Sequence, residues 1–343
     1  MLGSWRSFQS KALSFLLFMF VGLLFSGFFV NQSLQHQFQI SEPILLDILP
    51  GEGAGGVARR LVQKGLVSNP FPLIVRARIL GINESIKAGT YEIAHSDTPE
   101  LLLNKIFTGA TKKFSITFKE GLSFVDIVDE LSSADRLNHN ENLSGIRIDF
   151  LDNFLHENQI NFVNYEGLFF PDTYFYESDD KPSSILQMAA KRMIEILRIC
   201  WQNRELELFY KSPYEALIMA SIIEKESAMA SESHIISGVF QRRLRLGMRL
   251  QADPTVIYGL GQEFNGKLTY SGLKKDTPYN TYTRNGLPVT PISSPGLVSI
   301  KAALRPAKTN YLYFMAKGDG SHEFSTTLEE HNIAVDQYRE KKQ

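Results

Sequence analysis

The sequence predicts an α+β protein with a single transmembrane helix at its N-terminus, a small α+β module after it and a larger α+β domain towards the C-terminus. Three observations support this fold class. Residues 12–30 form an uncharged apolar run. Short strand and helix patterns alternate over residues 43–110. Longer helix patterns and proline-rich loops fill residues 111–343.

The apolar run has the length of a membrane-spanning helix. At ~1.5 Å per residue it nearly crosses the hydrocarbon core of a bilayer. Arg6 and Lys11 precede it and the next basic residue is Arg59, so the positive-inside rule places residues 1–11 in the cytoplasm as a short tail. A cleaved signal peptide is the alternative, but such peptides have shorter apolar cores and a small-residue cleavage site. We therefore predict an uncleaved anchor, followed by a polar linker at 31–42.

The small module is expected to contain short, capped elements. Residues 43–50 and 87–94 have strand patterns, and two helices are expected between them. A third helix should begin after Thr98, which is suited to the N-cap, with Pro99 in its first position and Gly109 as its end.

The larger domain is expected to begin with a strand and a helix and to contain a long helix near 183–202. Residues 138–145 are polar and predict a surface loop. From residue 250 onward loops are expected to dominate, because four prolines lie between 278 and 295. A strand and a final helix close the chain.

Overall composition excludes several functions. A net charge of −1 gives no electrostatic footprint for nucleic acid. The seven histidines and Cys200, the single cysteine, form no recognised metal pattern, and no Gly-rich nucleotide-binding motif follows a strand. We therefore predict no metal and no cofactor. No G-x-S-x-G motif is present, although a Ser-His-Asp triad assembled across the chain stays open.

Two glutamates in the segment ASIIEKES are candidates for chemistry. The helix that carries them should begin with a capping box, in which Ser212 is the N-cap, Pro213 follows and Glu215 lies three residues on. At ~100° per residue, Glu226 falls among the apolar residues and Glu224 points about 160° away. The apolar side would hold Ile218, Met219, Ile222, Ile223 and Met229.

A carboxyl group on a buried face is desolvated, which raises its pKa and suits it to general acid catalysis. Glu226 is therefore the candidate acid, and Glu224 is expected to be a surface or supporting charge. Helix geometry alone leaves an alternative open, in which Glu226 forms a buried ion pair with Arg242 or Arg243.

Polar and aromatic loops suggest a neutral polar ligand such as a glycan, with rings for sugar faces and amides or carboxylates for hydroxyls. One set is Tyr279, Asn280, Tyr282 and Arg284; the other is Gln251, Asp253 and Thr255. Packed tyrosines in a proline-braced loop, and a simple change of direction at Asp253–Pro254, are the structural alternatives.

Longer motifs then identify a family. EGLFFPDTY, ASIIEKES, RLGMRLQADPTVIYGLG, YNTYTRNGLPVTPISSPG, SIKAALRPA and YLYFMAKGDGSHEFS resemble, in order and wording, the endolytic murein transglycosylases of the MltG (YceG-like) family. The resemblance implies a LysM-like module at 43–110 and a transglycosylase catalytic domain at 111–343. It also implies a single-pass protein of the inner membrane whose catalytic domain is periplasmic.

The implied reaction is that of a lyase: cleavage of the MurNAc–GlcNAc bond of nascent peptidoglycan strands, leaving 1,6-anhydroMurNAc ends and terminating elongation. Glycan strands are the implied substrate, and peptidoglycan synthases are candidate partners. The second Glu of the E-K-E sequence is catalytic in the family and corresponds to Glu226. The substrate-binding candidates are Gln251, Asp253, Thr255, Asn280, Tyr282, Glu166 and Asp172.

The sequence departs from the family pattern at Ser227, where some members have Thr, and in the variable positions around Arg284, which carries less weight for that reason. Two alternative functions stay open. A hydrolytic muramidase would need a second carboxylate to activate water, for which Asp253, Glu166 and Asp172 are the candidates. A non-catalytic scaffold would bind glycan and recruit synthases.

Overall fold

The computed structural model describes residues 2–81, 86–143, 145–159 and 164–341. The chain divides into two compact units, Met1–Phe114 and Ser115–Gln343. The boundary expected from the sequence lies close by, between residues 110 and 111. Each unit has its own core, and each is described by itself.

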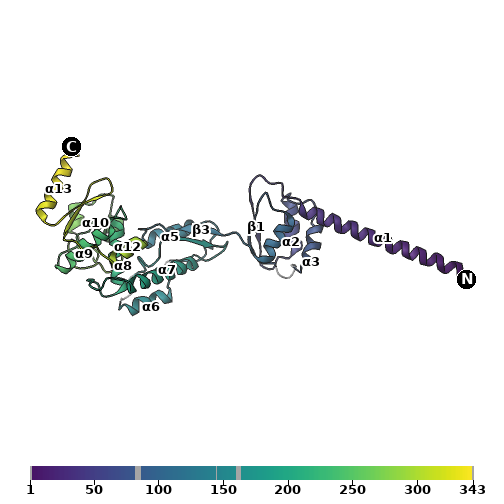
Figure 1. Cartoon of the computed structure of the whole chain (residues 1–343), viewed down its shortest axis with the longest axis horizontal. Coiled ribbons are helices and arrows are strands. Elements are labelled where there is room, and N and C mark those ends of the chain that lie inside the picture. Colours follow the sequence, from purple (N-terminus) through teal and green to yellow (C-terminus); the bar gives the residue numbers. More distant parts are fainter. Residues whose placement is uncertain (1, 82–85, 144, 160–163, 342–343) are drawn as a thin grey trace. The chain divides into compact units, whose positions relative to one another are not determined.

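The N-terminal unit begins with one long helix, α1 (Leu2–Gln35) (Figure 1). Among the described residues, one helical stretch is long and apolar enough to cross a membrane, Leu13–Gln35. The helix does not stop where the apolar run ends. It continues through the first part of the expected linker, and Leu34 and Phe38 are buried in the core of the module that follows.

The module is a two-stranded sheet covered by helices. Strand β1 (Ile44–Ile48) pairs antiparallel with β2 (Gly89–Ile93), so that Ile44 lies opposite Ile93. Helices α2 (Ala54–Gln63) and α3 (Phe71–Ile79) lie between the strands in sequence, and α4 (Pro99–Thr108) follows them.

The predicted ends of α4 are confirmed. The Thr98 hydroxyl accepts the N–H of Leu101, Pro99 is the first residue, and Gly109 ends the helix at a φ of 74°. A left-handed residue at this position is accessible to glycine at little steric cost, which is why the sequence could specify the end so sharply.

The larger unit begins with β3 (Phe114–Thr117), which pairs with β4 (Thr173–Tyr176). Three helices belong to this first part: α5 (Phe124–Ser133), α6 (Asp149–Glu157) and α7 (Pro182–Gln202). Ser123 and Asp126 form a reciprocal capping box at the start of α5, which fixes where the chain turns from β3 into the helix.

Helix α8 (Pro213–Glu226) is the centre of this unit. It packs against α7, α9 (Ser233–Arg245), α10 (Asp253–Leu260) and α12 (Leu297–Leu304) (Figure 1). The amphipathic pattern predicted for α8 is wrong, because Leu217, Ala220 and Ser221 are as fully buried as Ile222. A central helix surrounded on all sides has no solvent face to leave polar.

Two local predictions in this unit also need correction. Met229 lies beyond the end of α8 and is 43% exposed, so it is not part of its buried surface. The Ser212 hydroxyl accepts the Glu215 N–H as expected, but the Glu215 carboxylate accepts from the Lys211 N–H instead of closing a capping box with Ser212.

Residues 250–304 contain more helix than expected. Helices α10 and α12 lie in the region predicted to be mostly loop, and the short α11 (Tyr270–Lys274) lies between them. The Asp253–Pro254 pair opens α10 instead of marking a simple turn, because proline is tolerated in the first turn of a helix, where its missing N–H has no partner to lose.

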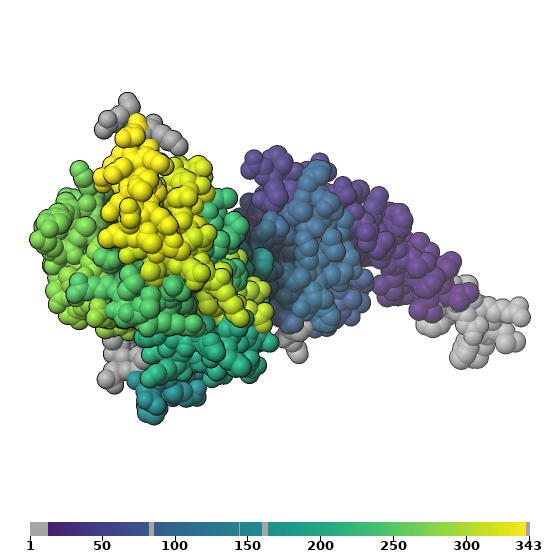
Figure 2. Space-filling model, turned by 60° about the vertical axis from the view of Figure 1, so that its left-hand side comes forward, coloured from purple at the N-terminus to yellow at the C-terminus, as the bar shows by residue number. Residues whose placement is uncertain are grey.

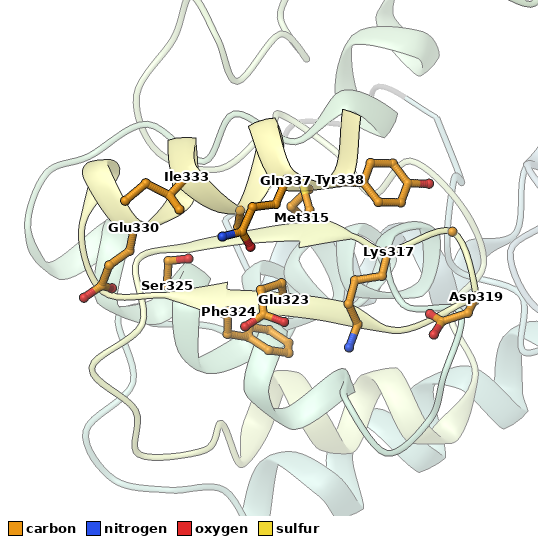
Figure 3. Close-up of a pocket in the computed structure, with 12 residues that line it drawn as sticks. Met315, Lys317, Asp319, Glu323, Phe324, Ser325, Glu330, Ile333, Gln337 and Tyr338 are labelled. Carbon is orange, nitrogen blue, oxygen red and sulfur yellow. The ribbon is translucent and has the colours of Figure 1, made fainter. Parts of the chain in front are cut away.

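A hairpin and a helix complete the chain. Strand β5 (Tyr313–Ala316) pairs antiparallel with β6 (His322–Ser325), and α13 (Leu328–Lys341) lies against both. Figure 2 shows α13, in yellow, raised on the surface of the unit. A cavity of about 780 Å³ opens between the hairpin and α13, with Glu323, Lys317 and Gln337 among its lining residues (Figure 3).

Candidate active site

Glu226 is the last residue of α8, at the point where the central helix reaches the surface. Its side chain is half-buried, and burial is the main reason why its pKa is raised to about 8. The negative charge of Asp253 raises this pKa further, while the guanidinium of Arg243 lowers it. The desolvated carboxyl inferred from the sequence is therefore present, although it sits at a helix end and not on one face of an amphipathic helix.

The buried ion pair considered as an alternative does not form. Among the described residues, no cation makes a salt bridge with Glu226 and no donor bonds to its carboxylate. Arg243 is almost fully buried, but it donates from Nε to the Leu312 carbonyl at 2.6 Å and from Nη1 to the Leu250 carbonyl at 2.8 Å. Its charge acts on Glu226 from a distance, so the carboxyl keeps a free oxygen for an incoming group.

Asp253 supplies a second carboxylate, whose negative charge acts on Glu226. It is the first residue of α10, and its Oδ1 accepts the Tyr282 hydroxyl at 2.5 Å. Burial and the adjacent Asp253 raise the pKa of Tyr282, which keeps this hydroxyl a donor. Two sets of candidates from separate loops, 251–255 and 279–284, are thus brought together at the end of α8.

The other residues of these two loops hold the loops in shape. Gln251 has a φ of 50°, and its side chain accepts from Arg243 at 3.5 Å. Thr255 is fully buried and its hydroxyl lies 2.8 Å from that of Thr281, which joins the two loops. Asn280 is also fully buried, and its amide donates to the carbonyls of Leu273 and Lys275.

Arg284 lies apart from this group of contacts. Its guanidinium makes a two-bond pair with the Asp276 carboxylate, at 2.9 and 3.0 Å, on the exposed side of the loop.

Glu166 is a buried carboxyl in a different setting. It is 2% exposed, and it accepts the N–H of Phe124 at the start of α5 and the hydroxyl of Tyr258 at 2.9 Å. Burial raises its pKa to about 7, against the opposing effect of these donors. Tyr258 lies in α10, five residues after Asp253, so Glu166 holds the helix that carries Asp253.

Asp172 is exposed at the beginning of β4. Its carboxylate accepts the N–H of Thr173 at 2.8 Å, and its carbonyl accepts the N–H of Phe118 next to β3. These contacts place it on the β3–β4 strand pair.

For Glu224 the sequence predicts a surface or supporting charge, without naming what it supports. Its Oε2 accepts the N–H of Gly296, the N-cap residue of α12, at 2.9 Å. The Glu120 carboxylate lies close to both residues. Burial and the negative charge of Glu224 raise the pKa of Glu120. The sequence feature that could have indicated this contact is the glycine of SSPG, Gly296. A Cβ at this position would overlap the Glu120 carboxylate, so a residue without a side chain is needed there.

The loop that follows Glu226 is also held in place. The Ser227 hydroxyl donates to the Met229 carbonyl at 2.8 Å and lies 2.9 Å from that of Ser233. Glu232, just before α9, accepts the N–H of His322 and pairs with its ring at 2.7 Å. The C-terminal hairpin thereby packs against the segment that leads away from the candidate acid.

The YceG-like family model matches residues 46–337. An endolytic murein transglycosylase of Bacillus subtilis is 29% identical over 306 residues, covering 85% of this chain and 84% of that protein. One from Streptococcus pneumoniae is 30% identical over 182 residues, which span 50% of this chain and 31% of the streptococcal protein.

A solved structure agrees with the fold. The crystal structure of a putative YceG-like protein from Listeria monocytogenes is 30% identical, covers 85% of this chain and 99% of its own, and superposes with a TM-score of 0.55. The family model spans most of the chain, including the helix that ends at Glu226 and the loops that meet it. This chain belongs to the YceG-like family.

Proposed function

We propose that the chain is a lytic transglycosylase that cleaves glycan strands of peptidoglycan internally, with Glu226 as its general acid and base. The observation that carries this proposal is a half-buried carboxyl with a pKa of about 8, free of any described cation partner and under the influence of a second carboxylate, Asp253. The names of the similar bacterial proteins supply the substrate class, since they are endolytic murein transglycosylases.

One carboxyl is enough for this reaction. Protonated Glu226 gives its proton to the glycosidic oxygen between MurNAc and GlcNAc as the C1–O bond breaks. The ionised Glu226 then takes the proton of the C6 hydroxyl of the same MurNAc as that oxygen bonds to C1. The products are a 1,6-anhydroMurNAc end and a free GlcNAc hydroxyl, no water is consumed, and Glu226 is protonated again.

Asp253 has a supporting role in this scheme. Glycosidic cleavage passes through a transition state with positive charge at C1. The negative charge of Asp253, oriented by the Tyr282 hydroxyl, raises the pKa of Glu226 and would also stabilise that positive charge. Gln251, Thr255 and Asn280 would act on substrate through the shape of the two loops, and Glu166 and Asp172 through the elements they hold.

We further propose that α1 anchors the protein in the inner membrane with its N-terminus in the cytoplasm. The support is the apolar stretch Leu13–Gln35 and the position of Arg6 and Lys11 before it. The module at 43–110 would be the LysM-like part and the larger unit would act on nascent strands in the periplasm. Synthases that make these strands are the partners this location implies.

A hydrolytic muramidase is the second candidate, because the charge of Asp253 acts on Glu226 and its carboxylate could activate water. Product analysis separates the two. We expect the full-length protein in detergent, incubated with uncrosslinked glycan strands, to release fragments with anhydro ends by mass spectrometry. Reducing ends would instead identify a muramidase, and uncut strands a non-catalytic scaffold.

The matched variants are Glu226→Gln and Glu224→Gln, two residues apart on the same helix. Glu226→Gln has no proton to give and should lower the release of anhydro ends by at least about 10³-fold. Glu224→Gln keeps an oxygen to accept the Gly296 N–H and should retain activity. Full cleavage by Glu226→Gln would show that another residue is the acid.

A further inference from the structure

Helix α3 exposes large apolar side chains on the face that points away from the module core. Pro72, Leu73 and Ala77 face the module core. The opposite positions, which follow the i, i+4, i+7, i+8 spacing of one helix face, are Phe71, Val75, Arg78 and Ile79. Phe71 is 56% exposed and Ile79 is 69% exposed, and the adjacent Leu80 is also exposed. Large apolar side chains this exposed at both ends of one short helix favour a contact with something outside the chain.

The position of α3 next to α1 indicates what that contact is. The two helices pack against each other, and Phe29 of α1 lines the same cavity of about 280 Å³ as Pro72 and Leu73 of α3. Figure 1 shows α3 beside the last turns of α1, whereas β1 lies further from the free part of that helix. Figure 2 shows the rest of α1, in purple, standing clear of the module on the visible side.

Helix length then sets the height of α3 relative to a bilayer. The apolar run of residues 12–30 accounts for ~28 Å, about the thickness of the hydrocarbon core, so that core ends near Val30. Val30 is already buried by the module, and so is Leu34 one turn later. No spacer separates the membrane-spanning part of α1 from the module, and Phe28 and Phe29 are exposed just below it.

We propose that the outward face of α3, together with Phe28 and Phe29, is a membrane-contact surface on which the module rests at the lipid headgroups. The proposal rests on the membrane anchor assigned to α1 under the proposed function. Aromatic and aliphatic side chains on such a face enter the headgroup–acyl boundary, and an arginine among them can reach lipid phosphates. Arg78 occupies that position on the exposed face.

Depth-dependent quenching of a fluorescent label tests the contact. Cys200 is replaced by serine in the full-length chain, and single cysteines at Phe71→Cys, Ile79→Cys, Leu49→Cys or Leu16→Cys are labelled with NBD. The proteins are reconstituted into phosphatidylcholine–phosphatidylglycerol vesicles that contain lipids with a shallow or a deep spin label. Leu49 is the matched control, an apolar residue of the module that is 63% exposed and follows β1.

We expect labels at 71 and 79 to lose about half of their fluorescence with the shallow quencher, as for residues in the interface. The label at 16 should respond to the deep quencher, and the label at 49 to neither. If 16 is quenched while 71 and 79 are as bright as 49, the anchor stands and the membrane-contact surface is refuted. If 16 is not quenched, the anchor fails and this proposal fails with it.

Discussion

At the scale of single residues, the candidate site depends on Glu226, an ionisable group that α8 places in a largely buried position. A helix that is buried around its whole circumference ends in a carboxyl group, and no described donor satisfies that group. Burial and the charge of Asp253 both favour the protonated form, while Arg243 opposes them. The result is an acid that is still protonated at neutral pH, which is what proton donation to a leaving group requires.

Activity should therefore fall as the pH rises through about 8, where Glu226 loses its proton. Replacing Asp253 with Asn removes a negative charge, so the ionised form of Glu226 becomes less unfavourable and its pKa falls. We expect the alkaline limb of the kcat/KM profile to move down by about 1 pH unit, with a lower maximum rate. Asp276→Asn, which removes an exposed carboxylate paired with Arg284, is the control variant and should leave the alkaline limb unchanged. An unchanged alkaline limb in Asp253→Asn would show that Asp253 does not raise the pKa of Glu226.

The same burial of Glu226 should lower the free energy of unfolding at high pH, where the carboxyl group is ionised. The folded-state pKa of Glu226 lies above its unfolded value of 4.5, so folding binds a proton between these values and stability falls as pH rises from about 4.5 to 8. Glu226→Gln cannot ionise and should gain on the order of 2 kcal/mol relative to the natural chain at pH 9, and little at pH 4. Urea denaturation at both pH values measures this, and an equal effect at each would contradict it.

At the scale of elements, the end of α8 is positioned by the start of α12. Glu224 accepts the Gly296 N–H, and buried Ser221 accepts the N–H of Ile292 at 3.0 Å through its hydroxyl. The N-terminus of α12 also favours a negative charge, since helix dipoles point their positive ends there. These contacts fix the last turn of α8, and with it the direction in which Glu226 leaves the helix.

Glu224→Ala should remove the acceptor for the Gly296 N–H and destabilise the larger unit by about 1–2 kcal/mol. Glu224→Gln keeps that acceptor and relieves the repulsion with Glu120, so it should be as stable as the natural chain or more so. Thermal unfolding of the two variants compares them. Equal losses of stability would show that the hydrogen bond to Gly296 contributes nothing.

Arg243 joins three segments of the larger unit. It spans from α9 to the carbonyls of Leu250 and Leu312, and its guanidinium lies 5.1 Å from the centre of the Tyr313 ring. Arg243→Met should leave buried carbonyls without a donor and cost about 2–4 kcal/mol. It should also raise the pKa of Glu226 by removing a cation, so the alkaline limb of activity moves up. A limb that moves down would contradict this arrangement.

At the scale of the whole molecule, α1 is at once a candidate anchor and a part of the module core. Val30, Leu34 and Phe38 are buried with module residues such as Leu61 and Tyr91. The candidate anchor and part of the module core therefore lie on one continuous helix.

A chain that starts at residue 40 should lose part of the module core, while one that starts at residue 27 should keep it. Burying Leu34 and Phe38 is worth about 1.5–3 kcal/mol each, so we expect the module transition of the shorter chain to melt more than about 10 °C lower. Calorimetry should show the transition of the larger unit unchanged in both. Equal module transitions would show that the end of α1 is dispensable.

Some features of this protein were determined by the sequence alone because they depend on neighbours in the chain. The ends of α4, the apolar run of α1 and the start of α8 follow from caps, prolines and hydrophobic length, and each was predicted. The choice of Glu226 over Glu224 was made from helix phase, but the phase argument assumed a polar side that α8 does not have.

Other features were decided only by the tertiary structure. The charge of Asp253 acts on Glu226, the Tyr282 hydroxyl bonds to Asp253 and Glu224 bonds to Gly296. These pairs are 27 to 72 residues apart in the sequence, and no local pattern encodes them. The physical reason is that burial and charge set the pKa of a carboxyl. Both depend on which segments pack around it, so the sequence could indicate the candidate acid but only the fold could assemble its environment.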